Sequence, residues 1–209
     1  MSIKKKGLLL VISGPSGAGK GTICKELLKV GASTKLSISA TTRNPRAGEK
    51  EGINYYYKTR EEFENMIAEG EFLEYAQIYD NYYGTPKKAI FHELEKGNDV
   101  ILEIEMQGAM QIKKAYPEAV FIFILPPSLM ELKNRIVGRG TETIEQIEKR
   151  FGSAYSEIKL IGDYDYFIFN NVVEKSADEI KHIIYAEKNK VGRYKKDVLE
   201  MFEKEIKKC

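Results

Sequence analysis

Short apolar runs alternate with amphipathic stretches along almost the whole chain. The clearest runs predict strands over residues 8–12, 99–105 and 119–125, because continuous apolar runs of this length are typical of buried parallel strands. Between them, apolar residues recur every three or four positions, which is the pattern of a helix with one buried face. Strands that alternate with helices predict an α/β fold, in which helices flank a parallel sheet.

The same reasoning places shorter elements between these runs. Thr59, with Glu62 three residues later, forms a capping box that predicts the start of a helix. The aromatic stretch at 81–86 predicts a turn that closes a segment of extended chain. Further strands are expected near 35–40, 54–57, 71–79 and 164–169, and further helices near 20–31, 87–95, 106–116, 128–137, 141–160, 176–190 and 192–207.

Two segments interrupt the alternation of strands and helices. Residues 40–85 are polar, rich in turn residues and dense in tyrosine, which predicts a small unit of short strands and one helix. Residues 126–160 open with two prolines and contain a Gly-Arg-Gly break, which predicts a helical unit. The core is then expected to combine the three remaining parts, 1–39, 86–125 and 161–209.

Composition narrows the classes of protein that remain. The 209 residues carry a formal net charge of only +2, which argues against a nucleic-acid coat or a membrane-surface protein. No apolar stretch approaches the roughly twenty residues that cross a bilayer. Two cysteines form no disulfide framework, so we expect a cytoplasmic protein. The charge and the short apolar runs lead us to expect neither nucleic-acid nor membrane partners. We further expect a monomer or a weak homo-oligomer.

The first apolar run leads directly into a glycine-rich turn that fits the phosphate-loop signature G-x-x-x-x-G-K. Glycines let backbone N–H groups surround an anion, and the following helix N-terminus and Lys20 add positive charge. A tight strand-to-helix turn without a ligand is the alternative, but the strand before and the helix after favour a phosphate site. Gly21 replaces the usual Ser or Thr, so direct ligation of Mg²⁺ by this loop is in doubt. The candidate phosphate-binding residues are Gly14, Pro15, Ser16, Gly17, Ala18, Gly19, Lys20, Gly21 and Thr22.

Acids and arginines lie at other places where such a site would need them. Glu103 and Glu105 end a buried strand beside the loop, where an acid commonly holds Mg²⁺ through water. Arg43 and Arg46 flank a proline and match phosphate oxygens as guanidinium forks. Surface charge is the alternative for each of these residues.

The 126–160 unit supplies two more arginines. Arg139 lies between glycines and Arg150 lies on the following helix, an arrangement that suits a lid over a transferring phosphoryl group. Ordinary helix-surface charge is again the alternative. A switch GTPase is disfavoured, because the chain has no Asn-Lys-x-Asp and its nearest Asp-x-x-Gly equivalent starts with Glu105.

Taken together, these motifs resemble the guanylate kinase family over nearly the whole chain. The resemblance implies a P-loop nucleoside monophosphate kinase-type core, a GMP-binding domain at 40–85 and a helical lid at 126–160. It also implies transfer of the γ-phosphate of ATP to GMP or dGMP, with Mg²⁺ as cofactor. The matching segments are 14–22, 39–49, 72–76, 81–85, 107–108 and 138–143.

The resemblance also assigns roles to single residues. For catalysis it implies Lys20, Arg43, Arg139 and Arg150, and for ATP the phosphate loop together with Asn170. Family members usually have aspartate at the position of Glu105, so its contact to GMP or to magnesium-bound water is the least secure. For GMP it implies Ser39, Arg43, Arg46, Tyr55, Glu74, Tyr83, Thr85 and Glu105.

Two other functions remain to be weighed. One is a guanylate-kinase-like scaffold that has lost catalysis and binds protein partners. Such a scaffold typically lacks the loop lysine or the lid arginines, whereas Lys20 and Arg139 are present here. The other is a kinase for a different nucleoside monophosphate, against which Glu74 and Thr85 argue.

Overall fold

The computed structural model describes residues 5–30, 33–46, 48–78, 80–138 and 144–207, with the backbone alone at 30 and 144–150. A five-stranded sheet forms its centre in the order β2-β7-β1-β8-β9, and every pair of neighbouring strands is parallel. The fold is therefore the expected α/β arrangement. The strands are β1 (Leu9–Ser13), β2 (Thr34–Leu36), β7 (Asp99–Glu103), β8 (Val120–Leu125) and β9 (Tyr166–Phe169).

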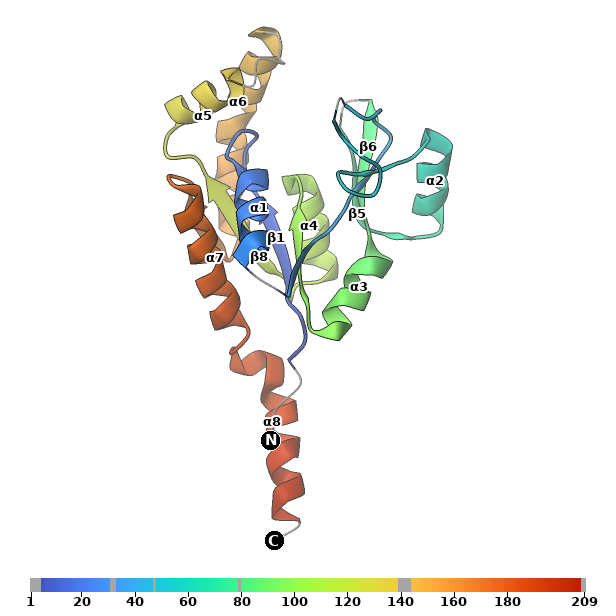
Figure 1. The fold of residues 1–209 in the computed structure, drawn as a ribbon, viewed down its shortest axis with the longest axis vertical. Coiled ribbons are helices and arrows are strands. Elements are labelled where there is room, and N and C mark those ends of the chain that lie inside the picture. Colours follow the sequence, from blue (N-terminus) through green and yellow to red (C-terminus); the bar gives the residue numbers. More distant parts are fainter. Residues whose placement is uncertain (1–4, 31–32, 47, 79, 139–143, 208–209) are drawn as a thin grey trace.

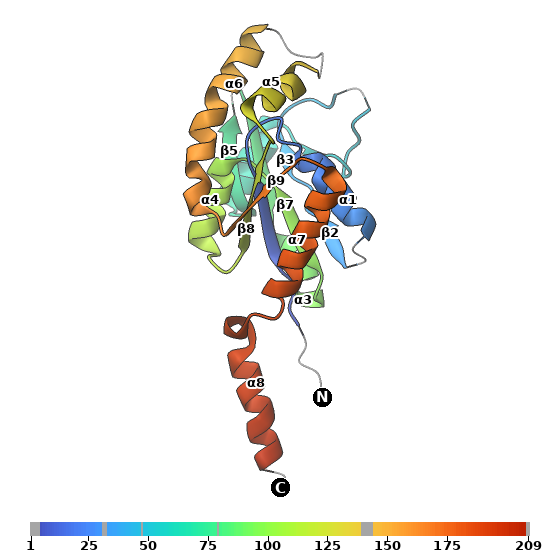
Figure 2. The same ribbon diagram turned by 90° about the vertical axis from the view of Figure 1, so that its left-hand side faces the viewer.

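Helices cover both faces of this sheet (Figures 1 and 2). Helices α1 (Lys20–Val30) and α7 (Val173–Glu187) pack together over one face, where Leu10, Ile12 and Ile23 are buried in a shared core. Helices α3 (Lys87–Lys96) and α4 (Met106–Ala115) close the other face. Because the central strands are buried on both sides, they are apolar at successive positions instead of alternating.

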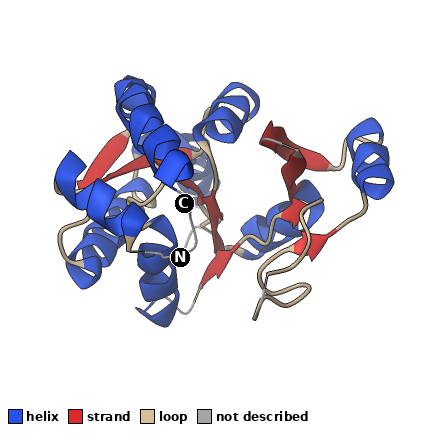
Figure 3. Cartoon of the chain, turned by 90° about the horizontal axis from the view of Figure 1, so that it is seen from above, coloured by secondary structure: helices blue, strands red, loops and turns tan. Residues whose placement is uncertain are grey.

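The 40–85 segment forms a second sheet beside the first (Figure 3). Its strand order is β4-β3-β6-β5, with β3 (Ala40–Thr41), β4 (Tyr56–Tyr57), β5 (Phe72–Ile78) and β6 (Asn81–Pro86). Helix α2 (Arg60–Ala68) starts at the expected capping box of Thr59 and Glu62. The Phe63 ring of α2 stacks on Phe72 with ring centroids 4.4 Å apart, which fixes the helix to the sheet.

Helices α5 (Leu129–Val137) and α6 (Ile144–Ile158), followed by the 3₁₀ helix η1 (Lys159–Asp163), form the segment after β8. The helix expected near 128–137 is confirmed as α5, and the Ser128 hydroxyl caps it by accepting the N–H of Glu131. Figure 1 shows α5 and α6 on one side of the molecule and β6 with α2 on the other.

The last helix, α8 (Val191–Ile206), extends away from the rest of the molecule (Figures 1 and 2). None of its residues is buried. Its base is held by charged contacts, because the buried Glu187 carboxylate accepts hydrogen bonds from Tyr166 and Arg193. Lys188 also pairs with the buried Asp99 at 2.7 Å.

Two expectations about local structure are wrong. Residues 81–86 form strand β6 instead of a turn, because their tyrosines pair with β5 across the second sheet. The strand expected over 35–40 is two strands in different sheets, β2 and β3. No helix in the described part of the chain is long and apolar enough to cross a membrane.

Candidate active site

The phosphate loop joins β1 to α1 as the sequence predicts. Gly17 and Gly19 have φ values of 91° and 92°, a backbone region that side chains with a Cβ rarely adopt. The Lys20 ammonium lies within the loop and donates to the carbonyl oxygens of Gly14 at 2.6 Å and Pro15 at 3.4 Å. The loop is therefore shaped for an anion, and its lysine rests on backbone oxygens that a phosphate oxygen can replace.

Two side chains from distant elements brace this loop. The Asn170 amide, just after β9, donates a 2.7 Å hydrogen bond to the carbonyl oxygen of Ala18. Arg135 on α5 donates to the same oxygen at 3.4 Å and to the Asn170 carbonyl oxygen at 3.1 Å. The structure thus brings Asn170 to the loop backbone, and it adds Arg135, which sequence reasoning missed because no motif marks it.

Glu157 on α6 also reaches the loop and was missed in the same way. Burial raises the pKa of its carboxyl above the usual value. The hydrogen bonds from Ser153 and from the Ser16 backbone, and the charge of Lys20, lower that pKa but do not cancel the effect of burial. A carboxyl group of α6 therefore lies close enough to the loop to interact with Ser16 and Lys20.

Glu103 is the last residue of β7, and Glu105 lies two residues beyond it, both beside the loop. The Glu103 carboxylate lies against Gly21, where an added Cβ would stand 3.2 and 3.3 Å from its two oxygens. Glu105 is exposed at the N-cap of α4 and makes no side-chain capping bond there. Glu103 is thus the acid beside the position of the usual loop hydroxyl, although the sequence favoured Glu105 for the metal.

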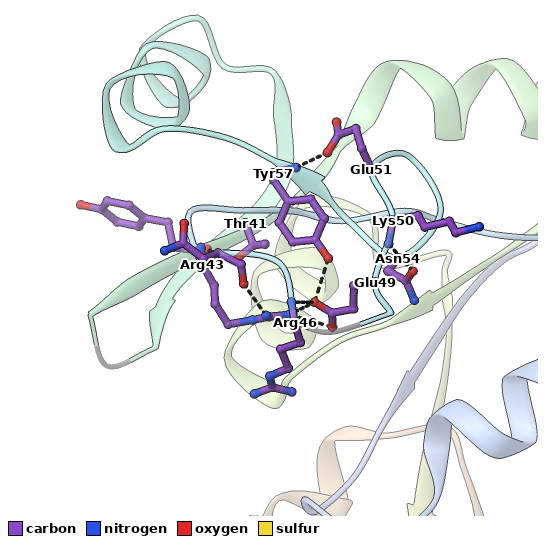
Figure 4. Close-up of polar contacts among 10 residues, drawn as sticks. Thr41, Arg43, Arg46, Glu49, Lys50, Glu51, Asn54 and Tyr57 are labelled. Carbon is purple, nitrogen blue, oxygen red and sulfur yellow. Dashed lines mark hydrogen bonds and ion pairs between the residues drawn. The ribbon is translucent and has the colours of Figure 1, made fainter. Parts of the chain in front are cut away.

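Arg43 is held in a network of charged and aromatic groups (Figure 4). Its Nη2 lies 3.0 Å from both carboxylate oxygens of Glu49. Glu49 also accepts the Arg46 N–H at 2.7 Å and the Tyr57 hydroxyl at 2.8 Å. Burial alone would raise the pKa of Glu49, but these three partners together lower it below its usual range. In the segment after β3, the Glu49 carboxylate therefore occupies the place where Arg43 is expected to meet a phosphate.

The other residues expected at the GMP phosphate lie near this network. The Arg43 guanidinium lies 5.5 Å from the centre of the Tyr55 ring, and the rings of Tyr55 and Tyr83 are 6.2 Å apart, edge to face. Ser39 is half-buried, and its carbonyl oxygen accepts the N–H of Tyr56. The Arg46 side chain is exposed and points away from Tyr57 in Figure 4.

Glu74 on β5 and Thr85 on β6 form a buried polar pair. The Thr85 hydroxyl donates to Glu74 Oε1 at 2.5 Å, and the two residues are only 7% and 0% exposed. They are directly paired across the two strands. Burial raises the pKa of Glu74 to about 7, although the hydrogen bond from Thr85 favours the charged form.

The side chains of the two arginines expected in the lid are not among the described parts of the structure. Arg139 lies outside the described residues. Arg150 falls within α6, and its side chain is also outside the description. Whether they reach the phosphate loop stays a prediction.

The core is a parallel sheet with a phosphate loop after its central strand, and the inserted sheet carries an arginine network and a buried carboxylate–hydroxyl pair. Together these features define a P-loop nucleotide kinase. The family model described as "Guanylate kinase" matches residues 6–187. The chain therefore belongs to the guanylate kinase family, whose members are nucleoside monophosphate kinases.

Individual relatives agree with this assignment. The guanylate kinase of Clostridioides difficile strain 630 is 70% identical over 97% of this chain and 98% of its own length. That of Caldanaerobacter subterraneus subsp. tengcongensis is 57% identical over 99% of this chain and 100% of its own. The crystal structure of guanylate kinase from Anaplasma phagocytophilum superimposes with a TM-score of 0.79 at 36% identity, covering 95% of this chain and 96% of that one.

Proposed function

We propose that this chain transfers the γ-phosphoryl group of ATP to GMP, and by the same contacts to dGMP, giving ADP and the nucleoside diphosphate. The observation that carries this proposal is the buried pair of Glu74 and Thr85. Guanine presents donors at N1 and N2 and an acceptor at O6. A carboxylate accepts both donors, and the threonine hydroxyl then turns to O6. Adenine has the opposite pattern, and sites built on such bonds reject a mismatched base by roughly 10⁴–10⁵.

In this proposal the second sheet binds GMP as a domain of residues 40–85. Arg43, Arg46, Tyr55, Tyr83 and Ser39 bind the GMP phosphate. Arg43 is already oriented by a carboxylate, and phosphate oxygens offer the same paired acceptors as Glu49 does. The ring of Tyr55 beside the guanidinium supports that orientation.

The core, residues 1–39, 86–125 and 161–209, holds ATP in the proposal. The backbone N–H groups of residues 14–22 surround its phosphates, and Asn170 fixes the loop through Ala18. Lys20 moves from the Gly14 carbonyl to the oxygens of the transferring group. Arg139 and Arg150, on the proposed lid of residues 126–160, add charge stabilisation worth on the order of 10³–10⁵ in rate.

The residues present fit a magnesium ion held mainly by nucleotide phosphates and water. In the described part of the chain, no group of three or more His, Cys, Asp or Glu side chains could hold a metal by itself. Mg²⁺ typically binds to one or two carboxylates plus phosphates, and Glu103 beside Gly21, or Glu105, offers such a carboxylate. When bound, the ion neutralises charge on the phosphate oxygens.

Neither alternative function gains support. A scaffold without catalysis has no use for Lys20 in a loop shaped for an anion, and a kinase for AMP or a pyrimidine nucleotide would leave Glu74 buried without its donors. The cytoplasmic location and the monomeric or weakly oligomeric state stay predictions.

A substrate panel with purified protein tests the proposal. ADP release should be fast with GMP and dGMP and slow with AMP, CMP and UMP. Equal turnover of AMP would refute the base-reading role of Glu74 and Thr85. Absence of turnover with every nucleotide would favour the scaffold.

A further inference from the structure

The strand that carries Glu74 is hydrogen-bonded to helix α4 through the side chain of Gln111. The Gln111 carboxamide accepts the Tyr75 N–H at 3.2 Å and donates to the Tyr75 carbonyl oxygen at 2.7 Å. Strand β5 is an edge strand, with β6 on its other side. Gln111 therefore replaces a neighbouring strand at the one residue that follows Glu74.

The backbone on the other side of Glu74 is irregular. The register between β5 and β6 shifts between Phe72 and Glu74, so the ladder does not hold the strand regularly there. A carboxylate directly after such a bulge needs a second restraint if its oxygens are to meet two donors on a ligand. The bonds from Gln111 supply that restraint from outside the sheet.

Helix α4 also leaves room for the carboxylate itself. Gly108, one turn before Gln111, faces Glu74, and an added Cβ there would collide with Glu74 Oε2. Gly108 lies in the first turn of α4, whose partial positive charge favours a nearby carboxylate. One face of α4 therefore fixes the backbone beside Glu74 and borders its side chain.

From these contacts we propose that Gln111 is a positioning residue for base recognition, and that Gly108 acts with it. The proposal rests on the proposed role of Glu74 as the guanine-reading carboxylate. Through its two bonds to Tyr75, Gln111 fixes the position of the backbone next to Glu74. Gly108 leaves space for Glu74 Oε2 to reach the position where it would accept the 2-amino group of guanine. Helix α4 starts directly after Glu103 and Glu105, so it ties the base-reading carboxylate to the phosphate side of the core.

Only a carboxamide makes both bonds to Tyr75, because it carries a donor and an acceptor on one planar group. Glutamate at position 111 would keep the size but place an acceptor against the Tyr75 carbonyl oxygen. Gln111 itself is exposed, so its replacement removes no buried core and the variants should fold.

The test compares GMP with IMP, the same nucleotide without the 2-amino group. We expect Gln111→Ala and Gln111→Glu to raise KM for GMP about tenfold and to lower the GMP-to-IMP ratio of kcat/KM by a similar factor. KM for ATP should stay unchanged. Gly108→Ala should lower the same ratio. Lys114→Ala, an exposed change on the same helix, is the matched control and should behave as the unmodified protein.

The outcomes separate this inference from the proposed function. If Gln111→Ala lowers the melting temperature but keeps the GMP-to-IMP ratio, Gln111 merely stabilises the sheet edge and the inference is wrong. If Glu74→Gln also leaves the ratio unchanged, the base-reading role of Glu74 fails first. A lowered ratio in Glu74→Gln, Gln111→Ala and Gln111→Glu, with Lys114→Ala unaffected, supports both.

Discussion

The Thr85 hydroxyl and the Glu74 carboxylate are joined by a 2.5 Å hydrogen bond in a place that water hardly reaches. A carboxylate without a cation beside it is costly to bury, and here the hydrogen bond from the hydroxyl offsets part of that cost. The consequence is a carboxyl with a pKa of about 7, poised to change its charge near neutral pH. In the proposed complex, binding of guanine requires the ionised form, because only that form accepts a donor on each of its two oxygens.

The Michaelis constant for GMP should therefore depend on pH. Below pH 7 an increasing share of Glu74 is protonated, so we expect KM for GMP to be about tenfold higher at pH 6 than at pH 8. KM for ATP should change much less. Initial rates at saturating ATP from pH 5.5 to 8.5 measure this profile. Glu74→Gln should flatten it, and an identical profile in that variant would assign the titration to another group.

The same carboxyl should destabilise the fold at high pH. Its folded pKa of about 7 lies above the ordinary value of 4.5, so the folded state binds the proton more tightly and stability falls as pH rises from about 4.5 through 7. Glu74→Gln keeps an acceptor for Thr85 and removes this penalty. We expect a higher melting temperature at pH 8, worth at most about 3 kcal/mol, and little change at pH 4.5. Glu69→Gln, an exposed change, should show neither effect. A gain equal at both pH values would contradict the argument.

Removal of the Arg43 guanidinium should weaken the binding of GMP and leave the binding of ATP unchanged. Arg43→Ala deletes the guanidinium whose Nη2 bonds Glu49 and which, in the proposed complex, binds the GMP phosphate. We expect kcat/KM for GMP to fall by about 10² or more, from the loss of charge-assisted bonds of 1.5–3 kcal/mol. Arg60→Ala, on α2 in the same segment, is the control and should keep normal kinetics. Normal GMP kinetics in Arg43→Ala would place the phosphate elsewhere.

Asn170→Ala should weaken the binding of ATP instead of the binding of GMP. It deletes the 2.7 Å bond that fixes the Ala18 carbonyl oxygen and so loosens the phosphate loop. KM for ATP should rise about tenfold for one lost buried bond, while KM for GMP stays the same. The neighbouring exposed residue gives the control variant, Asn171→Ala. Steady-state kinetics with each substrate varied in turn distinguish this result from general damage, which would raise both constants.

Lys20→Met should lower kcat with the fold intact. Methionine keeps most of the side-chain volume but removes the only full charge that the loop brings to the phosphates. Loss of one such electrostatic contact costs about 10²–10³ in kcat. Circular dichroism should be unchanged, and Lys25→Met, exposed on the same helix, should be fully active. Near-normal turnover of Lys20→Met would refute the role of this lysine.

The sequence predicted the features that depend on local pattern. The strand-to-helix turn of the phosphate loop, the capping box of Thr59 and Glu62 and the parallel sheet flanked by helices follow from spacing and propensity, and the structure confirms them. Residues 81–86 were predicted as a turn because tyrosine, asparagine and glycine gather there, yet pairing with β5 makes them a strand. Tertiary pairing outweighed local preference at that point.

Side-chain contacts between distant elements lay beyond reach of the sequence. Arg135 and Ala18 are 117 residues apart in the chain, and Gln111 and Tyr75 are 36 apart. No motif marks such pairs, since each depends on how one helix packs against a loop or a strand. The pairing of Glu74 with Thr85 could be expected only from family resemblance, and the roles of the site residues in binding stay predictions.

Helix α8 has a practical consequence for work with this protein. It carries the C-terminal end of the described chain away from the phosphate loop, from α5 and α6, and from the second sheet (Figure 1). Charged contacts at Glu187 and Lys188 fix the base of the helix. A tag, fluorophore or surface tether attached beyond Ile206 should leave both nucleotide sites unobstructed. The helix then acts as a spacer of about 24 Å, the length of sixteen helical residues.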